Sequence, residues 1–188
     1  MKRILALSLG LLLVAASCSS EREVVDKKES ENITASSAPP MMAKARADLA
    51  AKSGSKVSGT VDLVETSSGL SVNYSLSGLK KNATLGFHFH EKGDCSSKDA
   101  KSAGKHYLEV SPTGGTSKDN PQKYAGDLPQ IHTDANGKAE GSFTVSNLTV
   151  NKENPVEGRA IIVHGGPDDL AKKSPPRIAC GVVETVKM

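Results

Sequence analysis

Two histidines separated by one residue, His88 and His90, are the first residues in this sequence whose type and spacing indicate chemistry. They alternate with Phe87 and Phe89. On a β-strand, side chains at positions i and i+2 point to the same face, so both imidazoles can reach one metal ion. Such pairs also occur among ordinary surface and core residues. A metal site therefore requires further ligands from elsewhere in the chain.

Three more histidines follow. His164 ends the apolar run 160–164 and precedes two glycines, so it is placed to project from a strand end into a site covered by loops. Taken alone, it is better explained as an ordinary histidine at a rim. His106 lies in the stretch 91–130, which has no strand pattern, and long ordered loops are usually functional. His132, beside an Asp-Ala-Asn-Gly turn, is predicted to be a solvent-exposed turn residue.

Taken together, these histidines lie in segments that resemble the copper/zinc superoxide dismutases. The similarity runs from about residue 56 to about residue 186, which is nearly the whole domain. Because five motifs occur in the family's order, chance is a poor explanation. The matching segments are 86–95 (GFHFHEKGDC), 103–106 (AGKH), 126–129 (GDLP), 158–164 (GRAIIVH) and 177–183 (RIACGVV).

The resemblance implies both a fold and a metal. The fold is all-β, an eight-stranded Greek-key β-barrel (an immunoglobulin-like sandwich) with long metal-binding loops. The cofactor is copper, and four imidazoles in a roughly square arrangement suit Cu(II). The implied activity is dismutation of superoxide to oxygen and hydrogen peroxide. The implied copper ligands are His88, His90, His106 and His164.

The resemblance also assigns catalytic and structural roles to other residues. His106 would supply a proton, and Arg177 would guide the superoxide anion by its positive charge. The chain has three cysteines. If Cys18 carries a lipid, Cys95 and Cys180 remain, and export to an oxidising compartment would permit a disulfide between them. The family pattern implies the same pair.

The zinc half of the family's metal site is incomplete. His106 and Asp127 match two of the four zinc ligands, but the other two positions fall near Thr113 and at Tyr124, which are not histidines. A structural zinc site normally closes with four strong ligands, so zinc binding is doubtful. The segment between Asp168 and the C-terminal motif is also shorter than the family's charged loop. Both departures resemble the copper-only branch of the family.

Two carboxylates are candidates for orienting the histidines. Asp168 matches a family aspartate that links metal ligands, and here it is expected to bind the ring nitrogen of His88 that does not bind copper. Asp127 is expected to do the same for His106. For Asp168, the alternative interpretation is an exposed acidic turn residue.

The elements that position these residues are strands. Period-two alternation of apolar and polar residues occurs in 70–77 and in 139–145, and the segments 160–164 and 178–186 are apolar. The domain is assigned to residues 55–188. Residues 18–54, rich in Ser, Glu, Lys and Ala, are predicted to form a disordered tether, with a short helix possible over 41–52.

The N-terminus is predicted to be an export signal over residues 1–17. Lys2 and Arg3 precede an apolar run over 4–16 that is too short to span a bilayer. The residues before Cys18 resemble a bacterial lipobox, which predicts lipidation of Cys18; a plain secretory signal is the alternative. The expected location is the cell envelope, lipid-anchored at the periplasmic face of the outer membrane or at the cell surface.

Three functions are consistent with the sequence. Copper-dependent dismutation of superoxide is favoured, because a copper store has no need of an anion guide such as Arg177. The rivals are a copper-binding or storage lipoprotein without turnover and an inert relative. The net charge of +3 and scattered basic residues do not predict nucleic-acid binding. Expected partners are superoxide and a membrane, with a copper donor and a second copy of the chain as further candidates.

Overall fold

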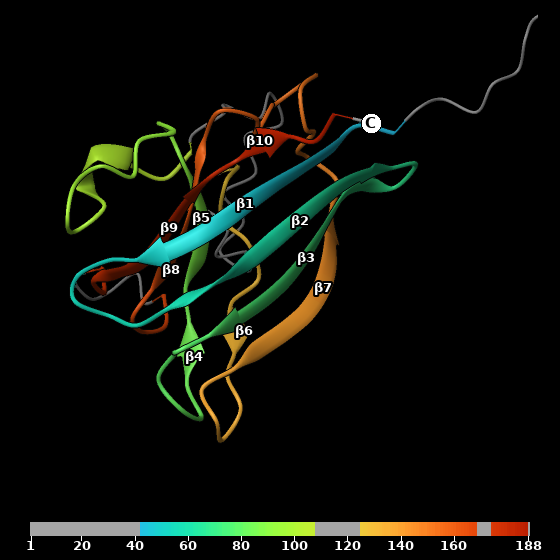
Figure 1. Ribbon diagram of the computed structural model, residues 1–188. Coiled ribbons are helices and arrows are strands. Elements are labelled where there is room, and N and C mark those ends of the chain that lie inside the picture. Colours follow the sequence, from blue (N-terminus) through green and yellow to red (C-terminus); the bar gives the residue numbers. More distant parts are fainter. Residues whose placement is uncertain (1–41, 108–124, 169–173, 188) are drawn as a thin grey trace, which may run out of the picture. The chain divides into compact units, whose positions relative to one another are not determined.

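The computed structural model describes residues 42–107, 125–168 and 174–187, and in them it is almost entirely β-structure (Figure 1). The predicted all-β class is therefore confirmed. One short 3-10 helix, η1, spans Lys101–Ala103. The strands are β1 (Lys44–Ala51), β2 (Ser58–Thr66), β3 (Gly69–Ser77), β4 (Thr84–Leu85), β5 (Phe87–His90), β6 (Ile131–His132), β7 (Ala139–Val145), β8 (Ala160–His164), β9 (Arg177–Val182) and β10 (Glu184–Thr185).

Eight of these strands form one curled antiparallel sheet (Figure 1). Its order is β5-β8-β9-β1-β2-β3-β7, and β10 pairs with β1 beside β9. Neighbours in the sheet are often distant in the sequence, so β1 joins the N-terminal hairpin β2–β3 to the C-terminal strands. The strands β4 and β6 form a separate two-stranded ribbon. Strands β5 and β8, which carry three of the predicted copper ligands, are direct neighbours.

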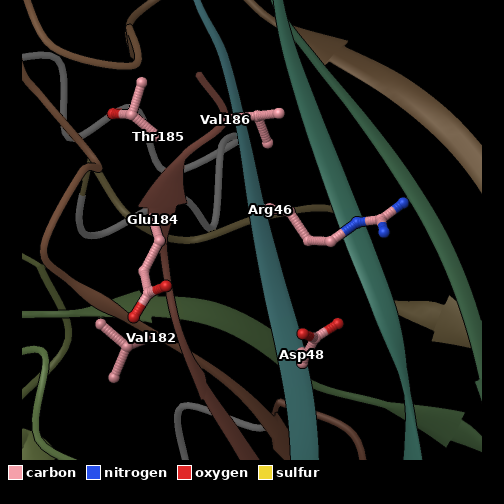
Figure 2. A pocket seen from close by; sticks show the side chains of 6 residues that line it. All are labelled: Arg46, Asp48, Val182, Glu184, Thr185 and Val186. Atoms are coloured by element: carbon pink, nitrogen blue, oxygen red, sulfur yellow. The ribbon is translucent and has the colours of Figure 1, made fainter. Parts of the chain in front are cut away.

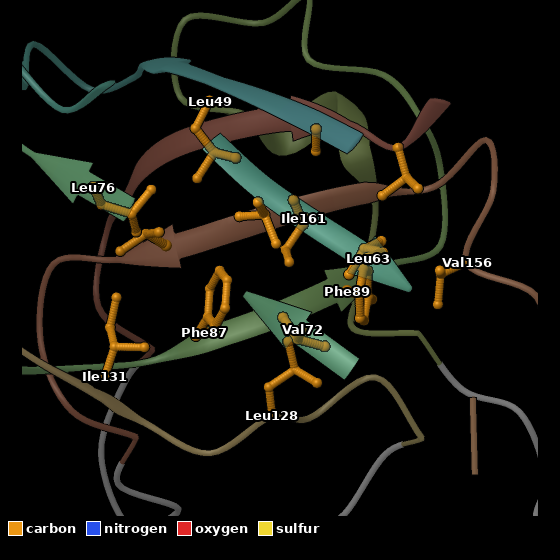
Figure 3. Packing of buried hydrophobic residues seen from close by; sticks show 14 of the residues in the cluster. Leu49, Leu63, Val72, Leu76, Phe87, Phe89, Leu128, Ile131, Val156 and Ile161 are labelled. Atoms are coloured by element: carbon orange, nitrogen blue, oxygen red, sulfur yellow. The ribbon is translucent and has the colours of Figure 1, made fainter. Parts of the chain in front are cut away.

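The inner face of the sheet carries the main apolar core (Figure 3). Along β2 and β3 the buried residues alternate with exposed or half-exposed polar residues, as the period-two pattern predicted. Leu63 and Val72 are fully buried opposite one another in the β2–β3 pair. Burial of one such side chain contributes about 1.5–3 kcal/mol relative to exposure, so this face is the main apolar source of the domain's stability.

The N-terminal boundary of the domain differs from the prediction. Residues 44–51 form strand β1, which pairs with β2, β9 and β10. The predicted short helix over 41–52 is therefore wrong, and so is the predicted end of the tether at residue 54. Ala45, Ala47 and Leu49 point inward and alternate with exposed charged residues. Alanine favours helices locally, but pairing on both sides overrides this weak preference.

Two smaller observations complete the fold. His132 is exposed, as predicted, but it lies in strand β6 rather than in a turn, with its Nδ1 atom 3.1 Å from the hydroxyl of Thr84. Among the residues that the structure describes, no helix is both long and apolar enough to cross a membrane. The predicted signal segment, Cys18 and most of the predicted tether lie outside the described residues.

Candidate metal centre

Strand β5 divides its side chains between two environments. Phe87 and Phe89 enter the main apolar core, whereas His88 and His90 project from the opposite face and are 1% and 0% exposed. Strand alternation alone produces this division. On the neighbouring strand β8, Ile162 pairs with His88 in the sheet register. The two histidines therefore lie on the outer face of the sheet, buried beneath loops.

The other two histidines reach the same place by different routes. His164 ends β8, where the register with β9 shifts between residues 163 and 164. His106 follows η1 in a loop and forms an isolated bridge with His90. The ring centroids of His88 and His106 are 4.1 Å apart, and those of His88 and His164 are 4.8 Å apart. One ligand atom from each of the four residues lies within 4.8 Å of the others.

Each of the four rings has one nitrogen held by the protein. His88 Nε2 lies 2.8 Å from Asp168 Oδ2, and His106 Nδ1 lies 2.9 Å from Asp127 Oδ1. The remaining two contacts are to backbone carbonyls, with His90 Nδ1 at 3.2 Å from Gly104 O and His164 Nδ1 at 3.0 Å from Pro175 O. These contacts fix the orientation of the rings, as partners of metal-bound histidines do.

Among the residues that the structure describes, the second nitrogen of three rings has no protein partner. His88 Nδ1, His90 Nε2 and His164 Nε2 are buried without a hydrogen bond. Leaving a buried polar atom unsatisfied costs about 1–3 kcal/mol, so three in one cluster call for a ligand. A metal ion that accepts lone pairs from imidazole nitrogens fits this arrangement, and all-imidazole sites suit copper. The residues present therefore fit a copper ion.

The protonation of the metal-free cluster also favours metal binding. Burial, with the nearby charge of Arg177, lowers the pKa of His90 to about 2. Burial, with the neighbouring His88, lowers the pKa of His164 to about 4. Both rings are therefore neutral near pH 7, which is the form of imidazole that binds a metal.

Arg177 lies at the start of β9, where it is anchored to the loop that contains η1. Its Nη1 donates to Ala100 O at 2.8 Å and its Nη2 donates to Gly104 O at 2.7 Å. Burial lowers the pKa of Arg177, but arginine remains charged at any physiological pH. Because Gly104 O also contacts His90, one carbonyl links the guanidinium to the histidine cluster.

The loop that holds Arg177 is tied to the sheet by a disulfide between Cys95 and Cys180, as predicted. The two sulfurs pack in a small apolar cluster with Ala100, Ala103 and Ile162. The backbone of Ala100 has a positive φ of 55°, which is uncommon for a residue with a Cβ. Its carbonyl nevertheless accepts from Arg177, so the loop holds an unfavourable conformation at the contact that positions the guanidinium.

Comparison with known proteins agrees with this geometry. A family model described as copper/zinc superoxide dismutase matches residues 57–183. The Cu-Zn superoxide dismutase 1 of Aquifex aeolicus is 38% identical over 153 residues, covering 75% of this chain and 88% of that protein. The Cu-Zn superoxide dismutase of Yarrowia lipolytica is 37% identical over 154 residues, covering 76% and 97%. The chain belongs to the copper/zinc superoxide dismutase family.

A solved structure extends the comparison to the fold. An SOD-like protein from Bacillus subtilis superposes with a TM-score of 0.62 at 30% sequence identity, covering 72% of this chain and 95% of that one. The family model begins at residue 57, so its match leaves out strand β1. This strand is nevertheless paired on both sides in the sheet, and it belongs to the domain.

The family's zinc site is only partly represented in the described residues. Asp127 and His106, which match two of its ligands, lie side by side, with Asp127 Oδ1 at 2.9 Å from His106 Nδ1. Within the described ranges, the four-histidine cluster is the one group of three or more His, Cys, Asp or Glu side chains placed to hold a metal. The sequence positions near Thr113 and at Tyr124 lie outside those ranges. Zinc therefore remains doubtful, as the sequence indicated.

Sequence reasoning did not identify several groups that shape this site. The carbonyls of Gly104 and Pro175 hold two of the histidines, but a backbone carbonyl leaves no signal in a sequence. Gly86 provides a partial signal, because a Cβ there would lie 2.4 Å from Asp168 Oδ1. The glycine that precedes the two histidines therefore makes room for the carboxylate that orients one of them.

A hollow with a volume of about 310 Å³ lies on the surface (Figure 2). It shares no residue with the histidine cluster. Its polar lining carries both signs of charge, and Arg46 is already paired with Asp62 at 2.7 Å. This lining selects no class of ligand. The hollow is lined by Arg46, Asp48, Val182, Glu184, Thr185 and Val186.

Proposed function

We propose that this protein is a copper-dependent superoxide dismutase that acts outside the cytoplasm, anchored to a membrane by a lipid on Cys18. The observation that carries the proposal is the convergence of four histidines, three of which have a buried ring nitrogen without a partner. The family assignment supports the activity. Two superoxide anions and two protons would give oxygen and hydrogen peroxide.

The protein's own residues would hold and orient the cofactor. Copper, when bound, supplies the one-electron redox chemistry that dismutation requires. Asp168 accepts a hydrogen bond from His88 Nε2, so Nδ1 of that ring would be the ligand atom. The carbonyls of Gly104 and Pro175 accept from Nδ1 of His90 and His164, so Nε2 would be the ligand atom in both. Because the protein fixes the tautomers of these rings, their protons need not be redistributed when the metal binds.

His106 is the ligand best placed to exchange a proton with solvent. Its side chain is 22% exposed, compared with 2% for His88. Its Nδ1 atom donates to Asp127 Oδ1, which places the lone pair on Nε2. The ring is therefore suited to deliver a proton to the substrate, as the family resemblance implies.

Arg177 would attract and orient superoxide. Its guanidinium is held by two carbonyls, and one of them, Gly104 O, also contacts the ring of His90, so the positive charge lies beside the histidine cluster. A fixed positive charge beside a binding site raises the encounter rate of a small anion. A protein that only stored copper would gain nothing from this charge.

The location outside the cytoplasm rests on the sequence. The charged and apolar N-terminal segment and the small residues before Cys18 favour export and lipidation. A disulfide between Cys95 and Cys180 suits an oxidising compartment. In that compartment the protein would receive copper from an extracytoplasmic donor.

The activity is tested by metal analysis and superoxide decay on the full chain, with and without added copper. We expect one copper per chain, nitrogen hyperfine coupling in the electron paramagnetic resonance spectrum of the Cu(II) form, and copper-dependent decay of superoxide. Copper binding without faster superoxide decay would support the copper-storage alternative instead. Absence of a nitrogen-ligated signal would overturn both.

The location is tested separately, by fractionating cells that express the wild-type chain or its Cys18→Ser variant. We expect the wild type in the membrane fraction and incorporation of a labelled fatty acid. The variant should lose both properties and retain its activity in solution. Equal amounts of the two chains in the membrane fraction would contradict the lipid anchor.

A further inference from the structure

Arg159 immediately precedes strand β8, and both of its main-chain polar groups are bonded. Its N–H donates to Val156 O at 3.1 Å, and its carbonyl accepts from Val183 N–H, between β9 and β10, at 2.9 Å. These two bonds hold the backbone of Arg159 independently of the loops over the metal centre. His164, a predicted copper ligand, ends the strand that starts at the next residue.

The side chain of Arg159 leaves the sheet and meets two of the segments that carry metal ligands. Its Nη1 donates to Glu91 O at 3.1 Å, one residue after His90. Its guanidinium carbon lies 3.4 Å from the ring centroid of Tyr107, one residue after His106. Its Nε donates to Pro155 O at 2.7 Å, which fixes the direction of the side chain. A cation over the face of an aromatic ring is attracted to it, so this contact joins the two segments.

Tyr107 transmits its position directly to His106. The residue is 3% exposed, its N–H donates to Phe89 O at 2.9 Å and its carbonyl accepts from Gly126 N–H at 3.0 Å. The backbone of Gly126 approaches so closely that a Cβ there would lie 2.8 Å from Tyr107 Cβ. A shift of the tyrosine therefore moves the adjacent histidine.

His106 has the greatest need of such an anchor. The other three ligands lie on strands β5 and β8, whereas His106 lies in a loop. Its ring is held by Asp127, and its backbone is joined to the strand side by the neighbouring pair Lys105 and Glu91, whose main-chain atoms bond at 3.0 Å. Its position thus depends on how the loop is held against β5.

We propose that Arg159 is a positioning residue for the metal centre, fixing the segment of His106 against that of His90 through the Tyr107 ring and the Glu91 carbonyl. It touches neither metal nor substrate. The inference rests on the proposed copper site. It assigns to Arg159 an effect on the geometry of one particular ligand, which is more specific than a contribution to overall stability.

Four variants test the proposal. Arg159→Met keeps most of the aliphatic stem but removes the cation and its donors, and Tyr107→Leu removes the ring. Each should weaken copper binding about tenfold, which is typical of substitutions at residues that orient metal ligands. The double variant should bind copper only slightly more weakly than either single variant, because both substitutions remove the same contact between the guanidinium and the ring. Arg159→Lys restores the charge without the planar fork, so it should recover part of the affinity.

The deciding readout is the Cu(II) paramagnetic resonance spectrum, which reports ligand geometry and not stability. Arg159→Met should shift the copper hyperfine splitting toward the value of a His106→Ala variant. Arg46→Met is the matched control, because Arg46 is also an arginine in a defined contact, an ion pair with Asp62 between β1 and β2. That control should leave copper affinity and spectrum unchanged.

The outcomes separate this inference from the proposed function. If the wild type shows the nitrogen-ligated signal but Arg159→Met keeps both its affinity and its spectrum, the positioning role is overturned and the copper site stands. If the effects of Arg159→Met and Tyr107→Leu on copper affinity add fully, the proposed coupling between Arg159 and Tyr107 is overturned. Should Arg159→Met fail to fold, an unchanged spectrum in Arg159→Lys and Tyr107→Leu would overturn the role. No signal in the wild type would overturn both.

Discussion

The two apolar clusters of this domain differ in size and in structural role. The cluster inside the sheet contains large aliphatic and aromatic side chains from almost every strand, among them Leu63, Phe87 and Ile161. In the described part of the chain, the cluster under the η1 loop contains only Ala100, Ala103, Ala160, Ile162 and Cys180, with Cys95 packed against it. The loop that holds Arg177 is therefore poor in apolar contacts.

The loop is fastened by other means. The disulfide joins it to β9, and the guanidinium of Arg177 bonds two of its carbonyls. A few directional contacts define geometry more narrowly than non-directional apolar burial does, but each carries a larger share of the region's stability. Stability and catalytic geometry are thus assigned to opposite faces of one sheet. Substitutions on the two faces should accordingly have separable effects.

The largest separable effect is expected from His164→Ala. The substitution removes one of the four converging rings and leaves a cavity, so copper affinity and dismutase activity should be almost entirely lost. The melting temperature of the metal-free protein should fall little, because the lost ring packs against loops rather than in the main core. Copper titration, superoxide decay and thermal unfolding measure the three quantities. A variant that retains wild-type activity would remove His164 from the site.

Loss of the disulfide should affect both faces. Joining residues 85 positions apart removes about 4.5 kcal/mol of unfolded-state freedom in the loop-entropy model. The double substitution of Cys95 and Cys180 by Ser should lower the free energy of unfolding by about that amount. Because the same bond secures the acceptors of Arg177, activity per bound copper should fall as well. Denaturant unfolding and metal-normalised assays check these expectations, and unchanged activity per copper would show that the loop is secured without the bond.

Leu63→Ala should affect the sheet alone. Leu63 is fully buried in the main core, and removing such a side chain costs about 3 kcal/mol. The free energy of unfolding should fall by that amount. The Cu(II) spectrum and the activity at 25 °C should not change, since the ligands lie on the opposite face of the sheet. A changed spectrum would show that the two faces are mechanically coupled.

The same contrast explains how much was predictable from the sequence. The alternation of His88 and His90 with two phenylalanines encodes a strand buried on both faces, and the motifs placed His106, His164 and the cysteine pair correctly. Side-chain type and spacing carry this information. Strand β1 was missed because its inward residues are mostly alanines, whose small apolar side chains give a weak period-two signal in a charged segment.

The contacts that tune the centre were less accessible to prediction. Asp127 and Asp168 were expected beside His106 and His88, and they lie there. By contrast, the carbonyls of Ala100 and Gly104 depend on backbone direction, which residue types do not record. The stacking of Arg159 on Tyr107 joins residues more than 50 positions apart. Pairings of this kind depend on the assembled fold, and no local pattern indicates them.

The smallest effect is expected from removing the positive charge of Arg177. Arg177→Gln keeps a side chain able to hydrogen bond but removes the positive charge beside the histidines. We expect kcat/KM to fall about tenfold and to lose much of its dependence on ionic strength, because steering of an anion is screened by salt. Copper affinity should change little. Arg46→Gln removes the same charge from strand β1, where Arg46 is paired with Asp62, and should leave the rate unchanged. Equal rates for both variants would mean that net charge, rather than the position of Arg177, guides superoxide.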